Sequence, residues 1–304
     1  MSRIFDALQR SVAEQSGVEY PDLMSVVTAS FEPPAEQAIS RPDTEARVLS
    51  VEAVEKAPTA ISEERASTRP LDFPSLEAEV APSSRLVFLT DPDSLAAEKF
   101  RFLGIRLRHL RQSRTLKKVL ITSTMPEEGK SLVSANLAGV LAGKKQKVLL
   151  IEGDLRRPVL MQQFGLCALP GLGEWLNSGQ QTISGIYYLR GPNLWLMPAG
   201  RAPENALELM QSGRLAHLMS ELASIFDWII VDSPPLLPLG DTSVWTRLTD
   251  GTLLIAREGT TRREPLQQGV EVLKKSDLIG VVLNGCMHLN QRNYYHYYSP
   301  VVKK

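Results

Sequence analysis

The stretch KVLITSTMPEEGKS, residues 118–131, decides the fold class of this 304-residue chain. Its first six residues are mostly apolar and predict a buried β-strand, and the pattern over 130–143 predicts a helix. The loop between them ends in Gly-Lys-Ser. A strand, such a loop and an immediate helix form the context that the phosphate-binding Walker A motif requires. The sequence therefore predicts a nucleotide-phosphate site at this turn.

The chemistry of this loop depends on backbone N–H groups and two side chains. Lys130 would contact the β and γ phosphates, Ser131 would bind magnesium, and the helix N-terminus would face the phosphates. Against the strict pattern G-x-x-x-x-G-K-[ST], Thr124 replaces the first glycine, and the alternative interpretation is a plain helix start. The expected nucleotide-binding residues are Thr124, Met125, Pro126, Glu127, Glu128, Gly129, Lys130, Ser131 and Leu132.

Strands and helices alternate along the rest of the chain. Continuously apolar strands between helices predict a doubly wound α/β fold, in which helices cover both faces of a mostly parallel sheet. The expected strands are 118–123, 147–152, 194–197, 228–232, 252–256 and 278–283, and the expected helices are 94–113, 130–143, 204–224 and 263–275.

Two further strands end in acidic residues. Glu152 and Asp154 follow one strand, and Asp232 follows another. Doubly wound sheets bind ligands beyond the carboxyl ends of their strands, so we expect these carboxylates beside the phosphate loop. The alternative is that they are ordinary polar strand ends. Asp232 is interpreted as a Walker B carboxylate that holds magnesium directly or through water.

The composition divides the chain into four parts: an amphipathic helix (1–15), a disordered acidic linker (16–84), the P-loop domain (85–288) and a C-terminal tail (289–304). Residues 13–84 carry 14 acidic and 5 basic side chains, whereas 85–304 have a net charge of +8. A basic folded part fits a phosphate site, and we expect no nucleic-acid partner.

The two cysteines, Cys167 and Cys286, lie far apart and indicate neither a disulfide framework nor a zinc site. The N-terminus lacks the apolar stretch of a signal peptide, and no run of about 18 uncharged apolar residues occurs. We therefore expect a cytoplasmic protein whose recruitment to the membrane depends on a partner.

Taken together, four motifs make residues 86–304 resemble the bacterial tyrosine kinases that regulate capsule and exopolysaccharide synthesis, relatives of the MinD and ParA ATPases. The family pattern S-x-x-P-G-E-G-K-[ST] appears as STMPEEGKS, D-x-D-L-R-x-P as EGDLRRP, D-x-P-P as DSPP, and the C-terminal tyrosine cluster as NYYHYYSP. The resemblance implies a protein-tyrosine autokinase that uses ATP and Mg²⁺. It also implies a separate membrane adaptor of the polysaccharide co-polymerase type and self-association in trans.

The resemblance further implies roles for individual residues. Catalysis would involve Lys130, Glu152, Asp154 and Asp232, with magnesium on Ser131, Asp154 and Asp232. Asn284 matches a position that contacts adenine in related ATPases, and Asp241 matches a further acidic position. The ring-assembly motif E-x-x-R-x-x-R is matched by Glu98 and Arg101, with Gly104 in the third place.

The expected phosphoacceptors are Tyr294, Tyr295, Tyr297 and Tyr298. On pattern alone these residues indicate an aromatic stripe or a partner-binding tail, and the resemblance favours the acceptor role. Two other functions stay open: a MinD-like ATPase switch without kinase activity, and a degenerate nucleotide-binding module. Glu127 stands where related loops have glycine, so we expect it to be strained at φ > 0 and to weaken nucleotide binding.

Overall fold

The computed structural model describes residues 73–143, 146–180, 182–237, 240–274 and 276–286. The predicted helix 1–15, the linker up to residue 72 and the tyrosine-rich tail lie outside the described residues. The expectations for these segments therefore stay predictions.

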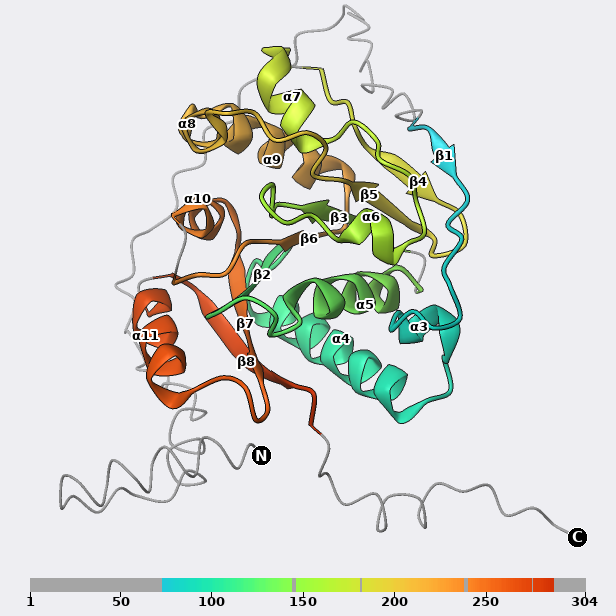
Figure 1. Cartoon of the computed structure of the whole chain (residues 1–304), viewed down its shortest axis with the longest axis vertical. Helices are drawn as coiled ribbons and strands as arrows, with labels where there is room; N and C mark the ends of the chain where they lie inside the picture. The colour runs from blue at the N-terminus through green and yellow to red at the C-terminus, as the bar shows by residue number, and fades with distance from the viewer. Residues whose placement is uncertain (1–72, 144–145, 181, 238–239, 275, 287–304) are drawn as a thin grey trace, which may run out of the picture. The chain divides into compact units, whose positions relative to one another are not determined.

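An eight-stranded sheet forms the centre of the described part, in the order β1-β4-β5-β3-β6-β2-β7-β8 (Figure 1). All neighbouring strands are parallel except the antiparallel pair β4 and β5. The strands are β1 (Ser75–Leu76), β2 (Lys118–Ser123), β3 (Val148–Glu152), β4 (Tyr187–Leu189), β5 (Leu194–Met197), β6 (Trp228–Asp232), β7 (Gly251–Arg257) and β8 (Leu278–Asn284). The doubly wound, mostly parallel sheet that the sequence predicts is confirmed.

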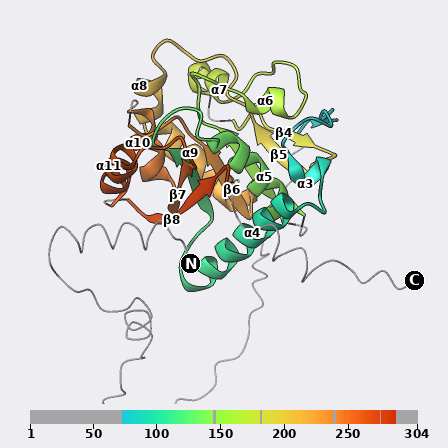
Figure 2. The same ribbon diagram turned by 60° about the horizontal axis from the view of Figure 1, so that its bottom comes forward.

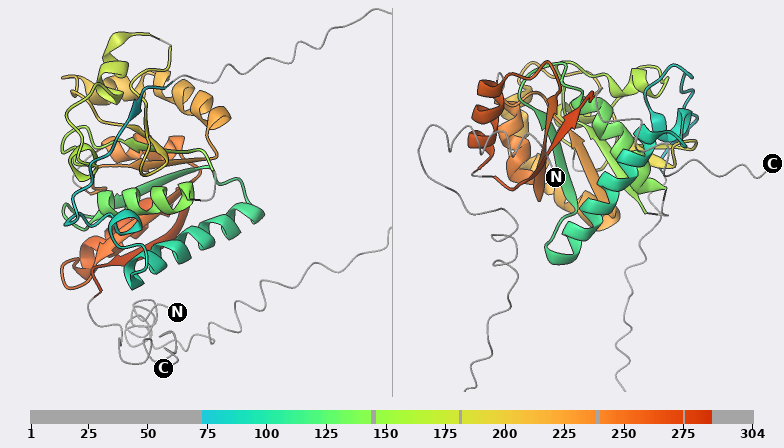
Figure 3. Two further views of the ribbon diagram at one scale, coloured as in Figure 1. Left: turned by 90° about the vertical axis from the view of Figure 1, so that its right-hand side faces the viewer. Right: turned by 90° about the horizontal axis from the view of Figure 1, so that it is seen from below.

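Helices cover both faces of this sheet, as the views in Figures 2 and 3 show. The helices are α3 (Val87–Thr90), α4 (Leu95–Ser113), α5 (Lys130–Ala142), α6 (Leu160–Gln163), α7 (Leu172–Ser178), α8 (Ala206–Gln211), α9 (Arg214–Ile225), α10 (Asp241–Leu248) and α11 (Arg263–Leu273). Alternate residues of a strand supply the two layers of core. Val119 and Ile121 pack on the side of α4 and α5, whereas Leu120 packs on the side of α7 to α10.

The first strand corrects the predicted domain boundary. The linker was expected to reach residue 84, but β1 pairs in parallel with β4, and the Phe73 ring stacks on Phe226 at 6.2 Å. The Pro- and Ser-rich local sequence does not show this, because a two-residue strand depends on the sheet edge that it meets. The folded part therefore begins by Phe73.

Helix α4 begins where its sequence predicts. The Ser94 hydroxyl accepts a hydrogen bond from the Ala97 N–H at 3.2 Å, and Arg101 forms an ion pair with Glu98. Gly104 is buried, and a Cβ there would lie 3.3 Å from Val140 of α5, so the third position of the ring-assembly motif faces the core. Within the described ranges, no helix combines the length and apolar character needed to cross a bilayer.

Candidate nucleotide-binding site

The predicted phosphate loop joins β2 to α5 at the carboxyl edge of the sheet. Gly129 precedes α5 with φ 93°, and the Asn284 side chain lies 2.1 Å from the place where a Cβ would stand, so this position requires glycine. Glu127 has φ 65°, which confirms the predicted left-handed backbone. Thr124 is not among the positive-φ residues of the described chain, so its backbone does not need the glycine of the strict motif.

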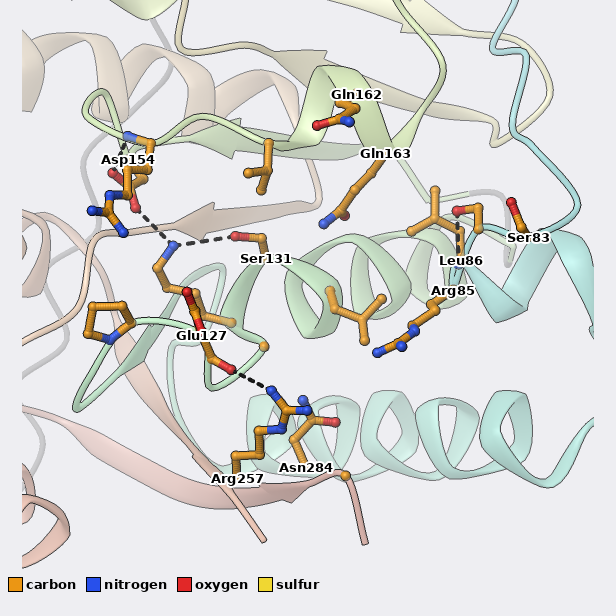
Figure 4. Close-up of a pocket in the computed structure, with 18 of the residues that line it drawn as sticks. Ser83, Arg85, Leu86, Glu127, Ser131, Asp154, Gln162, Gln163, Arg257 and Asn284 are labelled. Carbon is orange, nitrogen blue, oxygen red and sulfur yellow. Dashed lines mark hydrogen bonds and ion pairs between the residues drawn. The ribbon is translucent and has the colours of Figure 1, made fainter. Parts of the chain in front are cut away.

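Lys130 lies at the N-terminus of α5 and points toward the end of β3. Its ammonium group lies 2.9 Å from Asp154 Oδ2 and 3.4 Å from Ser131 Oγ (Figure 4). Burial acts to lower the pKa of Lys130, but the charges of Asp232 and Asp154 outweigh it and raise the pKa. The lysine is therefore a fixed positive charge at the phosphate end of the cavity.

Asp232 is buried at the end of β6, next to β2. Its Oδ1 accepts a hydrogen bond from Ser134 at 3.2 Å, whereas its buried Oδ2 has no hydrogen-bond partner among the described residues. Burial raises the pKa of Asp232 to about 6, although Lys130 acts to lower it. A buried, unpartnered carboxylate oxygen beside Ser131 and Lys130 suits a magnesium ion or a water molecule bound to one.

Glu152 ends β3 and Asp154 follows it, and their carboxylates have different partners. Asp154 lines the cavity, and its Oδ1 accepts hydrogen bonds from the Arg156 and Arg157 N–H groups. The fully buried Glu152 instead accepts from the N–H groups of Val159, Leu160 and Ala199. These donors occupy the carboxylate of Glu152, which argues against the catalytic role that the resemblance implies for it. Glu152 holds the segments that follow β3 and β5.

A cavity of about 970 Å³ opens in front of the loop. Figure 4 shows Lys130's partners Asp154 and Ser131 at one end of it, and Gln162, Gln163 and Arg85 at the other. Its walls come from the segment before α3, the phosphate loop, the loop after β3 and the ends of β7 and β8. The volume is that of a typical small-molecule site.

Asn284, which the resemblance matches to an adenine-contacting position, lines this cavity, and its amide also holds the phosphate loop. Its Nδ2 donates to the Glu128 carbonyl at 3.0 Å. Asp241, at the start of α10, forms an ion pair with Arg156 at 2.8 Å. It therefore supports the loop that presents Asp154. No group of three or more His, Cys, Asp or Glu side chains in the described chain could hold a metal by itself.

Sequence reasoning missed the roles of three residues around the loop. Glu128 is buried with 1% exposure, Arg257 donates to the Glu127 carbonyl at 3.1 Å, and Thr261 donates to the Glu128 carboxylate. Arg257 ends β7 and Thr261 lies in the turn before α11. Both are 130 or more residues from their partners in the loop, and no local spacing shows that they meet it. Within the motif, only the acidic Glu128 before Gly129 indicated that the loop makes such contacts.

No profile of a known protein family matches the chain. The chain is 33% identical to the tyrosine-protein kinase YwqD of Bacillus subtilis over 216 residues, covering 70% of this chain and 91% of that protein. It is 32% identical to the succinoglycan biosynthesis transport protein ExoP of Rhizobium meliloti, covering 66% of this chain but only 26% of ExoP. The solved kinase domain of Escherichia coli tyrosine kinase ETK matches with a TM-score of 0.63 and 29% identity, covering 66% of this chain and 79% of that domain.

Proposed function

Because this chain belongs to the family of bacterial tyrosine-protein kinases, we propose that it binds ATP and Mg²⁺ in the cavity and phosphorylates tyrosines near its own C-terminus. The observation that carries the proposal is the convergence of Lys130, Asp154 and Asp232, which come from three neighbouring strand ends. A plain helix start would need neither buried carboxylate. The fold thus supplies one cation for the phosphates and two acidic groups beside it.

In this scheme the side chains of the site have different roles. Lys130 has to exchange Asp154 for phosphate oxygens when the nucleotide enters, and this exchange leaves the Asp154 carboxylate free. Asp154, which lines the cavity, then accepts the proton from the tyrosine hydroxyl. Ser131 and Asp232 would hold magnesium, which would supply positive charge against the phosphates. Positioning and charge neutralisation account for most of the catalysis in this scheme.

The same family supports a biological role. ExoP is named for succinoglycan biosynthesis and transport, and this chain matches about a quarter of its length. We infer that the present chain serves capsular or exopolysaccharide synthesis or export, from the cytoplasmic side. A membrane adaptor of the co-polymerase type would recruit it, and the tail of one copy would enter the cavity of another.

Incubation of the full chain with γ-labelled ATP, followed by mapping of phosphotyrosine, tests the activity. Label on tyrosine supports the kinase, release of phosphate alone supports a MinD-like ATPase switch, and neither supports a degenerate binding module. Lys130→Met tests the site itself, because it removes the positive charge that would face the phosphates in the cavity. We expect it to abolish labelling, and the loss of the buried ion pair with Asp154 should also lower the melting temperature. Unchanged phosphotyrosine in Lys130→Met would contradict the assignment.

A further inference from the structure

The phosphate loop is held from behind by a group of side chains that the transfer chemistry does not use. Arg257, at the end of β7, donates to the Glu127 carbonyl, and Asn284, at the end of β8, donates to the Glu128 carbonyl. Thr261, in the turn before α11, reaches the Glu128 carboxylate. The ends of β7 and β8 thus fix the loop in place, and Figure 4 shows the Arg257 contact.

The Glu128 carboxylate is almost completely buried, with 1% exposure. It accepts hydrogen bonds from the Thr124 hydroxyl at 2.9 and 3.0 Å, from the Met125 N–H at 3.0 Å and from the Thr261 hydroxyl. A buried carboxylate is costly unless donors surround it. These donors meet only when the loop has its present shape, so the burial of Glu128 is linked to that shape.

The Thr261 hydroxyl has a defined direction. Its oxygen accepts the Arg257 N–H at 2.7 Å, so its own proton points to Glu128. Thr124, which replaces the first glycine of the strict motif, supplies the second hydroxyl, and its methyl group lies against Gly269 of α11. The carboxylate therefore faces donors only. A glutamine in its place would direct an NH₂ group at one of them.

We propose that Glu128 is a positioning residue that, through Thr261, keeps the phosphate loop in its nucleotide-binding shape before the nucleotide arrives. This inference rests on the proposed nucleotide site. The link opposes the strain of the left-handed Glu127, because a loop that relaxed at Glu127 would pull Glu128 away from its three donors. A loop that is already shaped loses little freedom on binding, and this raises affinity.

Thr261→Val tests the link, because valine keeps the shape of threonine and removes the hydroxyl. With the full chain, we expect calorimetry to show Mg·ADP binding about tenfold weaker than in the wild type, the loss that one charge-assisted hydrogen bond would give. The KM for ATP should rise by a similar factor, while kcat at saturating ATP stays within about twofold, since Thr261 does not touch the reacting groups. Thr261→Ser should restore both values.

Thr260→Val is the matched control, because Thr260 is the exposed neighbour in the same turn. It should bind Mg·ADP like the wild type. Hydrogen exchange of residues 124–129 without nucleotide should be faster in Thr261→Val and unchanged in Thr260→Val. If the wild type binds Mg·ADP and Thr261→Val binds it equally well, the positioning role is wrong. If the wild type itself binds no Mg·ADP, the proposed function fails instead.

Discussion

At the scale of single residues, Asp232 is the carboxylate of the site whose burial costs the most. Asp232 Oδ2 is buried without a partner in the described chain, and burial raises the pKa of Asp232 to about 6 from 3.8. The folded protein therefore binds this proton more tightly than the unfolded chain does. Stability from this group falls as pH rises from about 4 to about 6, and the cost is fully present above that window. The charged Asp232 carboxylate thus lowers the stability of the fold, and the same charge can bind a cation.

Asp232→Asn should separate these two effects. At pH 7 we expect the nucleotide-free variant to be more stable by on the order of 1–3 kcal/mol, because the amide carries no charge to desolvate. Its apparent affinity for magnesium in the presence of ATP should fall, because a carboxylate is lost from the metal site. Denaturant titrations at pH 5 and 7 and a magnesium titration of activity measure both. If the magnesium titration of Asp232→Asn is the same as that of the wild type, the assignment of Asp232 to the metal site is wrong.

Acidification should affect the wild type at the same group. As pH falls below about 6, Asp232 becomes protonated, so the KM for magnesium is expected to rise while the nucleotide-free fold is not destabilised by this residue. In Asp232→Asn, this part of the pH dependence should be absent. A pH series of magnesium titrations from 5 to 8 on both proteins checks this, and identical profiles would contradict it.

Glu127 has a strained backbone, because its φ lies in the left-handed region. Because φ is already 65° without nucleotide, Glu127→Gly should raise the free energy of unfolding by about 1 kcal/mol. It should also tighten ATP binding, since a negative charge near the triphosphate is removed. Glu127→Gln removes the charge and keeps the Cβ, so it should share the gain in affinity but not the gain in stability. Equal or lower affinity of Glu127→Gly for ATP would show that the loop depends on Glu127.

At the scale of helices and strands, the sequence predicted the elements that carry continuous patterns. Strands β2, β3 and β6 have mostly apolar centres; β2 leads into the phosphate loop, and β3 and β6 end in acidic residues. Both the sheet and its functional edge could therefore be predicted. Short elements such as β1 and α6 depend on contacts with distant residues, and the sequence predicts neither. The same limit applies inside the site: Glu152 and Asp154 share a motif, yet only the fold shows which one faces the cavity.

The contact between α3 and α5 makes a prediction at this scale. Gly139 of α5 lies under the Phe88 ring, and a Cβ at Gly139 would stand 2.2 Å from it. Gly139→Ala should therefore destabilise the protein by about 1–3 kcal/mol, although alanine favours a helix. Phe88→Leu in the same chain should recover part of the loss in a denaturant melt. Gly191→Ala is the control, because nothing lies within 4 Å of a Cβ there. An equal effect of both glycine substitutions would contradict the contact.

At the scale of the whole molecule, the acceptor tyrosines and the site occupy different parts of the chain. The cavity lies at the carboxyl edge of the sheet, whereas the predicted acceptors follow β8 in the last residues. Replacing Tyr294, Tyr295, Tyr297 and Tyr298 together by Phe should remove most autophosphorylation, while Mg·ATP affinity stays within about twofold, because a chain terminus contributes little to a core. Labelled ATP and calorimetry measure the two quantities.

Tyr187 and Tyr188 are the internal controls. They lie in β4, where their hydroxyls donate to Pro170 and Asn193, and they should carry no label. Label that persists on other tyrosines after the fourfold substitution would show that the tail is not the main acceptor.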